Sequence, residues 1–573
     1  MFRLNMNKNV IDRISGVITA ARNKKMLLCN ASIVVVVVIA FCCIKLTNAK
    51  SQRPNIIFIM ADDLGWNDVG FHGSNEIPTP NIDALAYSGL ILNNYYVTPI
   101  CTPSRSTLMT GKYAIHTGMQ HTVLFGAEAR GLPLTEKILP QYLKELGYDN
   151  HIVGKWHLGS YTKEYLPMSR GFDSHLGYWT GHQDYFDHYA VERPGFGLDM
   201  RRGMEVAYDL HGKYSTDIFT EESVKIISKH NTSKPLFLYL AHAAVHSGNP
   251  YNPLPAPDSE VQKFEYIKDY NRRRFAAMLS KLDQSVGEVV KALNDKGMLD
   301  NSIIIFTTDN GGPAAGFNLN AASNYPLKGV KNTLWEGGVR GAACVWSPLI
   351  KKSKRIALQM MHISDWLPTL LEAVGGNVSS KSNNLDGVSL WNALSNDDVS
   401  TRSEILHNID DEYGNAAVTV GPWKIVKGTT YGGQWDYWYG PNGRNYAFNA
   451  SLILNSKVGK TLNALGKMPK LSEIEEIRKN ATIDCQQNHN QGTKCNPVAK
   501  TCLFNIIEDP CELNDVANHF PEILHRLEET LSKYNETAIP PGNLPLDPRG
   551  NPKYHNFVWT NFGDFYQTIV ESL

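Results

Sequence analysis

Four apolar runs of strand length each stop at polar side chains that can carry chemistry. The runs, with the residues that follow them, are 55–61 with Asp62 and Asp63, 236–241 with His242 and His246, 302–308 with Asp309 and Asn310, and the short 151–153, which turns through Gly154 into Lys155 and His157. None of them alternates apolar with polar residues, which is typical of strands buried on both faces of a parallel sheet.

Helical patterns separate these runs, at residues 138–146, 217–230 and 271–293. Strands alternating with helices predict an α/β fold with a large central, mostly parallel sheet flanked by helices. Ligands of such sheets bind beyond the carboxyl ends of the strands. We therefore expect the acid pairs, the histidines and the lysine to meet at one edge.

The pattern changes after about residue 395. The chain becomes turn-rich and aromatic, most clearly at 431–439, and a cysteine cluster and a Pro-rich tail follow. We predict a catalytic domain over residues 50–395 and a smaller C-terminal α+β domain over 396–573.

The first 49 residues have the pattern of a secretory signal. A basic pair precedes the apolar run 33–44, and Ala49 is a small residue at a suitable cleavage position. Twelve residues reach only about 18 Å along a helix, short of the ~30 Å hydrocarbon core. The alternative is an uncleaved signal anchor over 26–46. Both predict entry into the secretory pathway and a lysosomal or secreted protein, with membrane contact only if the segment is not cleaved.

Cysteine usage agrees with an oxidising compartment. Four of the nine cysteines crowd together near the C-terminus and predict disulfides, of which three pairings are possible: Cys485, Cys495, Cys502 and Cys511. Cys344 lies in an apolar run, and we expect a buried thiol. Glycosylation sequons occur at Asn231, Asn377, Asn449, Asn480 and Asn535.

Composition excludes several classes of protein. Lys and Arg total 56, as do Asp and Glu, so the formal charge is zero. A nucleic-acid binder or a polybasic membrane binder needs a surplus of basic residues. Hydrophobic residues make up 42% of the chain, too many for a disordered protein.

The two acid pairs offer only oxygen ligands. Asp62, Asp63, Asp309 and Asn310 present carboxylate and amide oxygens, which suit a single hard cation such as Ca²⁺ or Mg²⁺. A lone Asp-Asp pair more often forms a solvated turn or a helix cap. Two such pairs, each ending a buried strand, favour the metal site.

Cys101 stands at the start of a predicted helix. Thr102 fits the N-cap and Pro103 the first helical position, and Gly111 ends the helix. Helix N-termini attract anions, and Arg105 lies about one turn in. A soft thiolate is a poor ligand for a hard cation. The pattern is consistent only if Cys101 becomes an oxygen-bearing group.

Several motifs resemble those of the sulfatase family. They are residues 101–105 (Cys-Thr-Pro-Ser-Arg) with 108–111, 147–157, 61–66, 78–83, 334–340 and 503–510. The resemblance covers nearly everything after Arg53 and is greatest to the arylsulfatase B subgroup, which acts on N-acetylgalactosamine 4-sulfate in dermatan and chondroitin sulfates. One departure is Asn150, where the family usually has Ser or Thr.

The resemblance implies an alkaline-phosphatase-like fold and a set of site roles. Cys101 is converted to formylglycine by the formylglycine-generating enzyme, and Ca²⁺ is held by Asp62, Asp63, Asp309, Asn310 and the modified residue 101. Arg105 and Lys155 orient the aldehyde hydrate, His157 hydrogen-bonds it, Lys331 grips the sulfate and His246 faces the leaving oxygen. The family often has His-x-Pro at His246, whereas this chain reads His-Ser-Gly-Asn-Pro.

The activity so implied is hydrolysis of a sulfated sugar or an aryl sulfate. The hydrate attacks sulfur, His246 or Lys331 protonates the leaving oxygen, and His157 removes a proton so that sulfate leaves. Three alternatives stay open. The first is a phosphatase or phosphodiesterase of the same superfamily, which commonly uses Thr or Ser as the nucleophile and binds two zinc ions. The others are a catalytically silent sulfatase-like binding protein and a cysteine hydrolase that pairs Cys101 with His157.

Other polar and aromatic residues have simpler explanations. We expect His242 to be a core residue and Lys328 to be solvated. His182 and His188 either line a substrate cleft or cap a surface loop. The aromatic run 431–439 either stacks on sugar rings or packs between the two domains.

Overall fold

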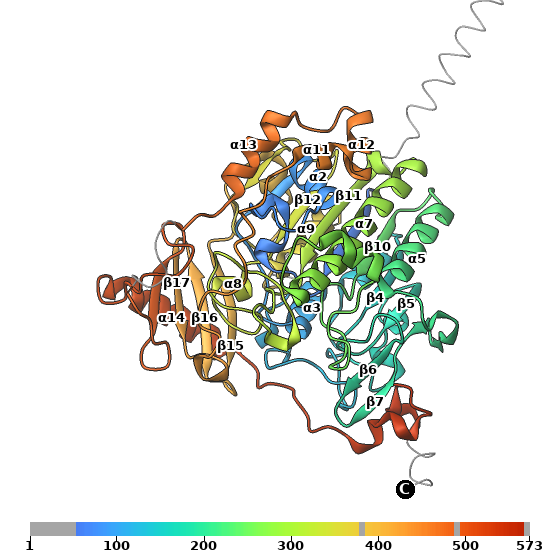
Figure 1. Ribbon diagram of the computed structural model, residues 1–573. Helices are drawn as coiled ribbons and strands as arrows, with labels where there is room; N and C mark the ends of the chain where they lie inside the picture. Colours follow the sequence, from blue (N-terminus) through green and yellow to red (C-terminus); the bar gives the residue numbers. More distant parts are fainter. Residues whose placement is uncertain (1–52, 377–383, 486–492, 566–573) are drawn as a thin grey trace, which may run out of the picture. The chain divides into compact units, whose positions relative to one another are not determined.

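A computed structural model describes residues 53–376, 384–485 and 493–565 (Figure 1). The predicted signal segment, 1–49, and the sequon at Asn377 lie outside these ranges. No helix within them is long and apolar enough to cross a bilayer.

A ten-stranded sheet forms the centre of the molecule, in the order β13-β2-β12-β11-β1-β10-β4-β5-β8-β9. Its five middle strands are all parallel: β11 (Ser302–Thr308), β1 (Asn55–Ala61), β10 (Leu236–Ala241), β4 (Asp149–Lys155) and β5 (Ser174–Tyr178). Antiparallel pairings occur only toward the edges, through β12 (Ala343–Trp346), β2 (Leu90–Leu92), β8 (Arg201–Arg202) and β9 (Glu205–Val206). The edge strand β13 (Arg355–Ala357) pairs with β2 in parallel. The predicted fold class is confirmed.

Helices cover both faces of this sheet because its strands are apolar on both sides. Alternate residues of β1 belong to two different hydrophobic clusters. One face packs against α2 (Pro80–Ser88), α5 (Ser215–Lys229) and α7 (Tyr270–Asp295). The other packs against α3 (Cys101–Thr110), α4 (Leu139–Glu145) and α9 (Trp366–Ala373).

The middle strands end in register. Ala61 pairs with Thr308, Met60 with Ala241, and Ala241 with Gly154. Gly154 lies inside β4, not at a turn as the sequence suggested. Its φ is +104°, and a Cβ there would sit 1.9 Å from the Ala241 carbonyl oxygen, so only glycine fits. The residues after these strands therefore meet at one edge.

The C-terminal part contributes a second sheet. It is antiparallel and contains β15 (Glu404–Asp410), β16 (Asn415–Val420), β17 (Trp423–Lys427) and β18 (Cys502–Asn505), with α14 (Pro521–Thr537) packed on it. Helices α11 (Ala450–Asn455), α12 (Lys457–Ala464) and α13 (Leu471–Ala481) instead join the hydrophobic cluster of α2 and α7. The domain boundary near residue 395 stays a prediction, because Pro54–Leu573 forms one compact unit.

Short elements complete the described chain: β3 (Tyr95–Tyr96), β6 (Tyr189–Glu192), β7 (Gly195–Leu198), α6 (Asp258–Val261), α8 (Glu336–Val339), β14 (Met361–His362) and α10 (Trp391–Asn396). β6 and β7 form a hairpin. The tail after α14 runs back to this hairpin, where the Leu198 amide donates to the Phe557 carbonyl (2.8 Å) and the Trp559 amide to the Leu198 carbonyl (3.1 Å) (Figure 1).

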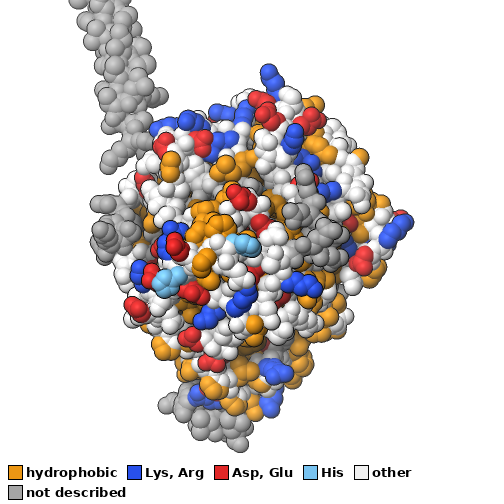
Figure 2. All heavy atoms as spheres, turned by 90° about the vertical axis from the view of Figure 1, so that its left-hand side faces the viewer, with side chains coloured by type: hydrophobic (Ala, Val, Ile, Leu, Met, Phe, Trp, Pro, Cys, Tyr) orange, Lys and Arg blue, Asp and Glu red, His pale blue; other side chains and the backbone are white. Residues whose placement is uncertain are grey.

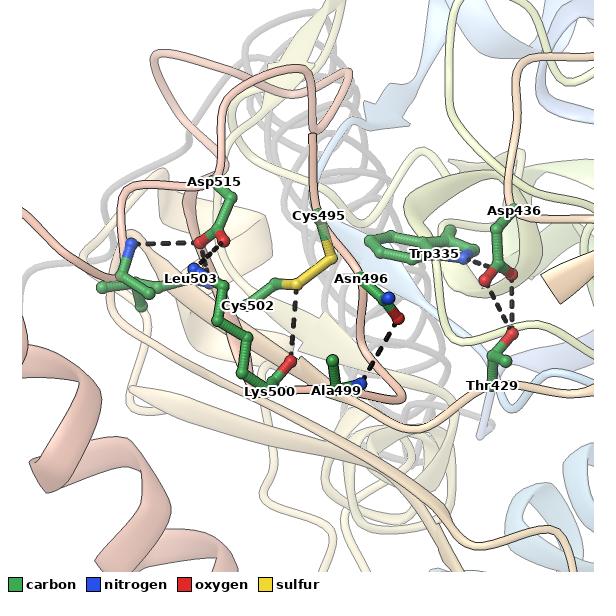
Figure 3. The surroundings of a disulfide bond; sticks show 11 residues. Trp335, Thr429, Asp436, Cys495, Asn496, Ala499, Lys500, Cys502, Leu503 and Asp515 are labelled. Carbon is green, nitrogen blue, oxygen red and sulfur yellow. Dashed lines mark hydrogen bonds and ion pairs between the residues drawn. A yellow bond between two sulfur atoms is a disulfide. The ribbon is translucent and has the colours of Figure 1, made fainter. Parts of the chain in front are cut away.

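The four clustered cysteines form two disulfides, Cys485–Cys511 and Cys495–Cys502. Figure 3 shows the second, beside the start of β18 and close to Trp335, whose indole donates to Asp436 (2.8 Å). Cys344 is a buried free thiol, as predicted.

Acidic and basic side chains are interspersed on the face shown in Figure 2. This mixed surface agrees with the zero formal charge and offers no basic tract of the kind that binds a polyanion on that face.

Candidate active site

Both acid pairs lie at the carboxyl edge of the parallel sheet, fully buried. Asp62 and Asp63 follow β1, and Asp309 and Asn310 follow the neighbouring β11. The Asp63 amide donates to Asp309 Oδ1 (3.2 Å), and Asn310 Nδ2 donates to Asp63 Oδ1 (2.7 Å). Asp63 has φ +64°, a left-handed conformation that turns the chain sharply at the end of the strand.

Cys101 is the first residue of α3, and Ile100 is the N-cap. The predicted N-cap, Thr102, is wrong: its hydroxyl donates to the His157 carbonyl (3.3 Å) and accepts the Leu124 amide (3.1 Å) instead of capping the helix. The Cys101 thiol is 1% exposed and lies 3.5 Å from Asp62 Oδ1. Burial raises its pKa far above the ordinary value, so the unmodified group is a thiol.

Three buried cations face the carboxylates. Arg105 donates through Nε and Nη2 to Asp309 Oδ2 (3.1 and 2.8 Å). Lys155 Nζ lies 2.6 Å from Asp62 Oδ2. Lys331 Nζ lies 2.7 and 2.8 Å from the two oxygens of Asp63. Each carboxylate thus has a cation of its own.

The electrostatics of the acids follow from these contacts. Burial raises the pKa of Asp63, but Lys331 and His246 outweigh burial, and the net shift is downward. Burial and the neighbouring Asp62 raise the pKa of Asp309 despite Arg105. Three carboxylates against three cations leave the cluster without net charge when all six groups are ionised.

The residues present fit a hard metal ion. Asp62, Asp63, Cys101 and His246 each bring a ligand atom within 4.8 Å of the others, a group that could hold a metal. Asn310 Oδ1 is a buried acceptor without a hydrogen-bond partner, beside Asp63. An oxygen left without a donor in such a place is suited to a cation.

His157 is oriented as a base. Its Nε2 lies 3.0 Å from the Leu124 carbonyl oxygen, which can only accept, so the ring proton is on Nε2. Nδ1 is buried without a hydrogen-bond partner. Burial, then Lys155 and Arg105, lower the pKa well below the usual range, so the ring is neutral with a free lone pair.

His246 is the candidate histidine that lies next to a carboxylate of the cluster. Its Nδ1 is 2.6 Å from the Ser247 carbonyl oxygen and its Nε2 is 3.5 Å from Asp63 Oδ2. His182 stacks on it, with ring centroids 5.9 Å apart. Burial is the largest cause that lowers the pKa of each to about 3. His182 therefore belongs to the site.

Several other expectations fail or turn out differently. Lys328 is buried, not solvated, with Nζ 3.6 Å from the Trp335 ring centroid. His188 neither lines the cleft nor caps a surface loop, because it is fully buried and bonds the Leu210 carbonyl (3.0 Å). His242 is a core residue, as expected, 3.0 Å from the Ser285 hydroxyl.

The aromatic run 431–439 packs on the loop before Lys331. Tyr431 and Trp435 both make edge contacts with Phe317, at 5.5 and 5.1 Å. Asn332, next to Lys331, donates to the Tyr431 hydroxyl (2.8 Å). Tyr431 is 47% exposed, so packing leaves part of its ring accessible.

Sequence reasoning missed Glu192, a buried carboxylate at the end of β6. It accepts the amides of Gly126 (2.8 Å) and Gly181 (3.0 Å) and lies 3.9 Å from His182 Nδ1. Burial raises its pKa to about 7. No motif includes Glu192, and no pattern in the sequence indicated a role for it.

Comparison with known proteins agrees with this geometry. The sulfatase family profile matches residues 54–376, more than half of the chain. Mouse arylsulfatase J is 41% identical over 514 residues, covering 89% of this chain and 80% of the relative. Human N-acetylgalactosamine-6-sulfatase is 30% identical, covering 60% of this chain and 66% of the relative.

Solved structures give the same result. The crystal structure of Ps i-CgsB in complex with k-i-k-neocarrahexaose aligns with a TM-score of 0.67 and 27% identity, covering 87% of this chain and 96% of that one. At 87% of this chain, the aligned part is longer than the segment 53–376 that contains the parallel core.

Proposed function

This chain belongs to the sulfatase family, a family of sulfate ester hydrolases, and from that premise we propose that it cleaves sulfated sugars or aryl sulfates with a formylglycine at position 101 and one Ca²⁺. The observation that carries the proposal is the cluster of three carboxylates and three cations around Cys101. Beside it, Asn310 Oδ1 and His157 Nδ1 are buried and have no hydrogen-bond partner.

The charge balance explains why a metal suits the reaction. Without an ion, the three cations neutralise the three carboxylates. A divalent ion held by Asp62, Asp63, Asp309 and Asn310 would give the pocket a double positive charge. Preorganised positive charge stabilises the negative oxygens of a reacting sulfuryl group, commonly the largest catalytic contribution.

The bound groups would supply two kinds of chemistry: the aldehyde hydrate of residue 101 provides an oxygen nucleophile, and the calcium ion polarises it and the sulfate. The side chains supply the rest. Lys155 and Lys331 bind sulfuryl oxygens, His157 Nδ1 accepts a proton from the hydroxyl beside it, and His246 faces the departing oxygen.

Two alternatives have less support. A cysteine hydrolase requires a thiolate paired with His157, yet burial keeps Cys101 protonated and its thiol contacts Asp62 Oδ1 instead (3.5 Å). A two-zinc phosphatase requires several histidine ligands, and in the described chain only His246 joins the candidate ligand group.

Substrate class is inferred from the relatives. Those compared include N-acetylgalactosamine-6-sulfatase and a structure in complex with k-i-k-neocarrahexaose, and they support a sulfated sugar. We infer the N-acetylgalactosamine 4-sulfate type from the motif resemblance to the arylsulfatase B subgroup. Entry into the secretory pathway, toward the lysosome or the cell exterior, fits the exposed sequon residues Asn231, Asn449, Asn480 and Asn535.

Mass spectrometry of the peptide containing residue 101, combined with a nitrocatechol sulfate assay, tests the proposal. We expect the mass of formylglycine, and activity that a calcium chelator removes and Ca²⁺ restores. Cys101→Ser lacks the second hydroxyl and should not turn over. An unmodified thiol in an active enzyme, or normal turnover by Cys101→Ser, would overturn the proposal.

A further inference from the structure

The ring of His157 is framed by two loops. The carbonyl of Leu124 fixes its Nε2. Gly181 packs against the Cε1–Nε2 edge of the same ring, since a Cβ built there would be 2.9 Å from both atoms. His157 itself has φ +56°, which is uncommon for a residue other than glycine, so the surrounding structure must hold it in place.

One carboxylate joins these two loops. Glu192 Oε2 accepts the amide of Gly126, two residues after Leu124 (2.8 Å), and Glu192 Oε1 accepts the amide of Gly181 (3.0 Å). Its side chain is 4% exposed. A buried carboxylate with a separate backbone donor on each oxygen is a strong tie, because losing either bond leaves a buried polar group unsatisfied.

Glu192 also lies beside the second histidine pair. Its Oε1 is 3.9 Å from His182 Nδ1, and His182 stacks on His246. Displacing the loop at Gly181 would therefore disturb both His157 and the His182–His246 stack.

The C-terminal tail supports this arrangement from outside. Trp559 donates its indole N–H to the Ala190 carbonyl (3.0 Å) in the strand that ends at Glu192. A Cβ on Gly126 would lie 2.7 Å from Trp559 Cε3, so the indole ring packs directly on the first loop. Ala127, Ala190 and Trp559 form a hydrophobic cluster of their own.

We propose that Glu192 is a positioning residue for the hydrolysis reaction: it ties the Leu124–Gly126 and Gly181–His182 loops together and so holds the ring of His157, with Nε2 bonded to Leu124 and Nδ1 free to accept a proton. Trp559 of the tail supports the tie. The inference rests on the proposed function of His157 as a base, and Glu192 does not contact the reacting groups.

Glu192→Gln tests it, because the amide nitrogen cannot accept a backbone N–H and one tie must break. A misplaced catalytic group costs up to about 10² in rate, so we expect kcat to fall roughly 10–100-fold with KM within about twofold. Hydrogen exchange should rise in peptides containing Gly126 and Gly181. Gly181→Ala, which crowds the His157 ring, should also lower kcat.

Asp283→Asn is the matched control. Asp283 is also a buried carboxylate that joins two segments, in this case α7 and α2, which lie on the sheet face opposite to α3. Its Oδ1 accepts the backbone amides of Asn81 and Ile82 (2.9 Å each) and its Oδ2 accepts the Asn81 side-chain amide (2.8 Å), so the amide nitrogen of asparagine must break one of these bonds. We expect this variant to lose stability and to keep the wild-type kcat.

The outcomes are separable. Wild-type kcat in Glu192→Gln with faster exchange at Gly126 or Gly181 would refute the positioning role while leaving the proposed function intact. Equal losses of kcat in Glu192→Gln and Asp283→Asn would show a general stability effect and also refute it. An inactive wild type that carries formylglycine and Ca²⁺ would refute the function itself. If Glu192→Gln does not fold, Trp559→Phe decides: loss of the indole donor should lower kcat severalfold, and an unchanged kcat would overturn the proposal.

Discussion

This protein has two clusters of buried charges. One joins two parts of the fold, and the other forms the candidate active site. The Lys424 cluster consists of Lys424, Glu336, Glu512, Arg340 and Tyr96, and joins the second sheet to the loop around α8. Lys424 Nζ lies 2.8 Å from Glu336 and 2.9 Å from Glu512. The Glu336 amide donates to Glu512 (2.8 Å), and the Tyr96 hydroxyl donates to Glu336 (2.9 Å).

The site cluster consists of Asp62, Asp63, Asp309, Arg105, Lys155, Lys331 and Cys101. It is as deeply buried and as closely paired, and two acceptors beside it, Asn310 Oδ1 and His157 Nδ1, have no hydrogen-bond partner. The Lys424 cluster also has such an acceptor, His407 Nδ1, beside Tyr96. Perturbed pKa values occur in both clusters. Burial and ion pairing therefore do not identify a reactive site. Convergence of ligand atoms does: among the described residues, Asp62, Asp63, Cys101 and His246 form the one group whose ligand atoms all lie within 4.8 Å of one another, so that a single ligand can complete them.

Lys331→Met is the test of this comparison with the largest expected effect on kcat. Removing a cation that stabilises the reacting sulfuryl group should lower kcat by roughly 10²–10³. Lys328→Met is the matched control, since Lys328 is a buried lysine three residues away that faces aromatic rings instead of Asp63. Steady-state kinetics on nitrocatechol sulfate decide. Equal losses of kcat from the two substitutions would show that the position of Lys331 in the site cluster does not matter for catalysis.

Lys424→Met tests the other cluster. Breaking a buried ion pair by removing one partner typically costs about 3–5 kcal/mol of stability, because the opposite charges stay buried. We expect a lower urea midpoint for unfolding and an unchanged kcat per folded molecule. A selective loss of kcat with normal stability would mean that this cluster takes part in catalysis.

Glu512→Gln gives the smallest and most specific effect. Burial is the main cause that raises the pKa of Glu512, from 4.5 to about 7, in spite of Lys424. The folded state therefore holds a proton that the unfolded state releases, and this group makes stability fall as pH rises from about 4.5 to about 7. The glutamine variant should lose less stability than wild type across that interval, measured by urea unfolding. An identical pH dependence would contradict the assignment.

The sequence predicted the parallel core and most of the site, for physical reasons. Non-alternating apolar runs require burial on both faces, and parallel strands end at one edge, so the acids after β1 and β11 had to meet there. The contradiction between a cysteine and hard-cation ligands was also visible in the sequence. Motif resemblance then supplied Lys331 and the histidine roles.

The features that the sequence did not predict depend on contacts between segments that are far apart in the chain. Glu192 is more than sixty residues from Gly126, and no local pattern indicates which amides a buried carboxylate will meet. The N-cap of α3 was misplaced because Thr102, a good capping residue, bonds elsewhere. Lys328 was expected in solvent because a lysine over aromatic rings has no signature in the sequence.

The returning tail has a consequence for biosynthesis. Residues around Trp559 are translated after every strand of both sheets, yet they pack beside a hairpin made some 360 positions earlier. A nascent chain that stops short of Trp559 would lack this support, so full activity should appear only once this segment has been made and has packed. Truncation a few residues before Trp559 would leave both sheets with all their strands and still yield a less active enzyme.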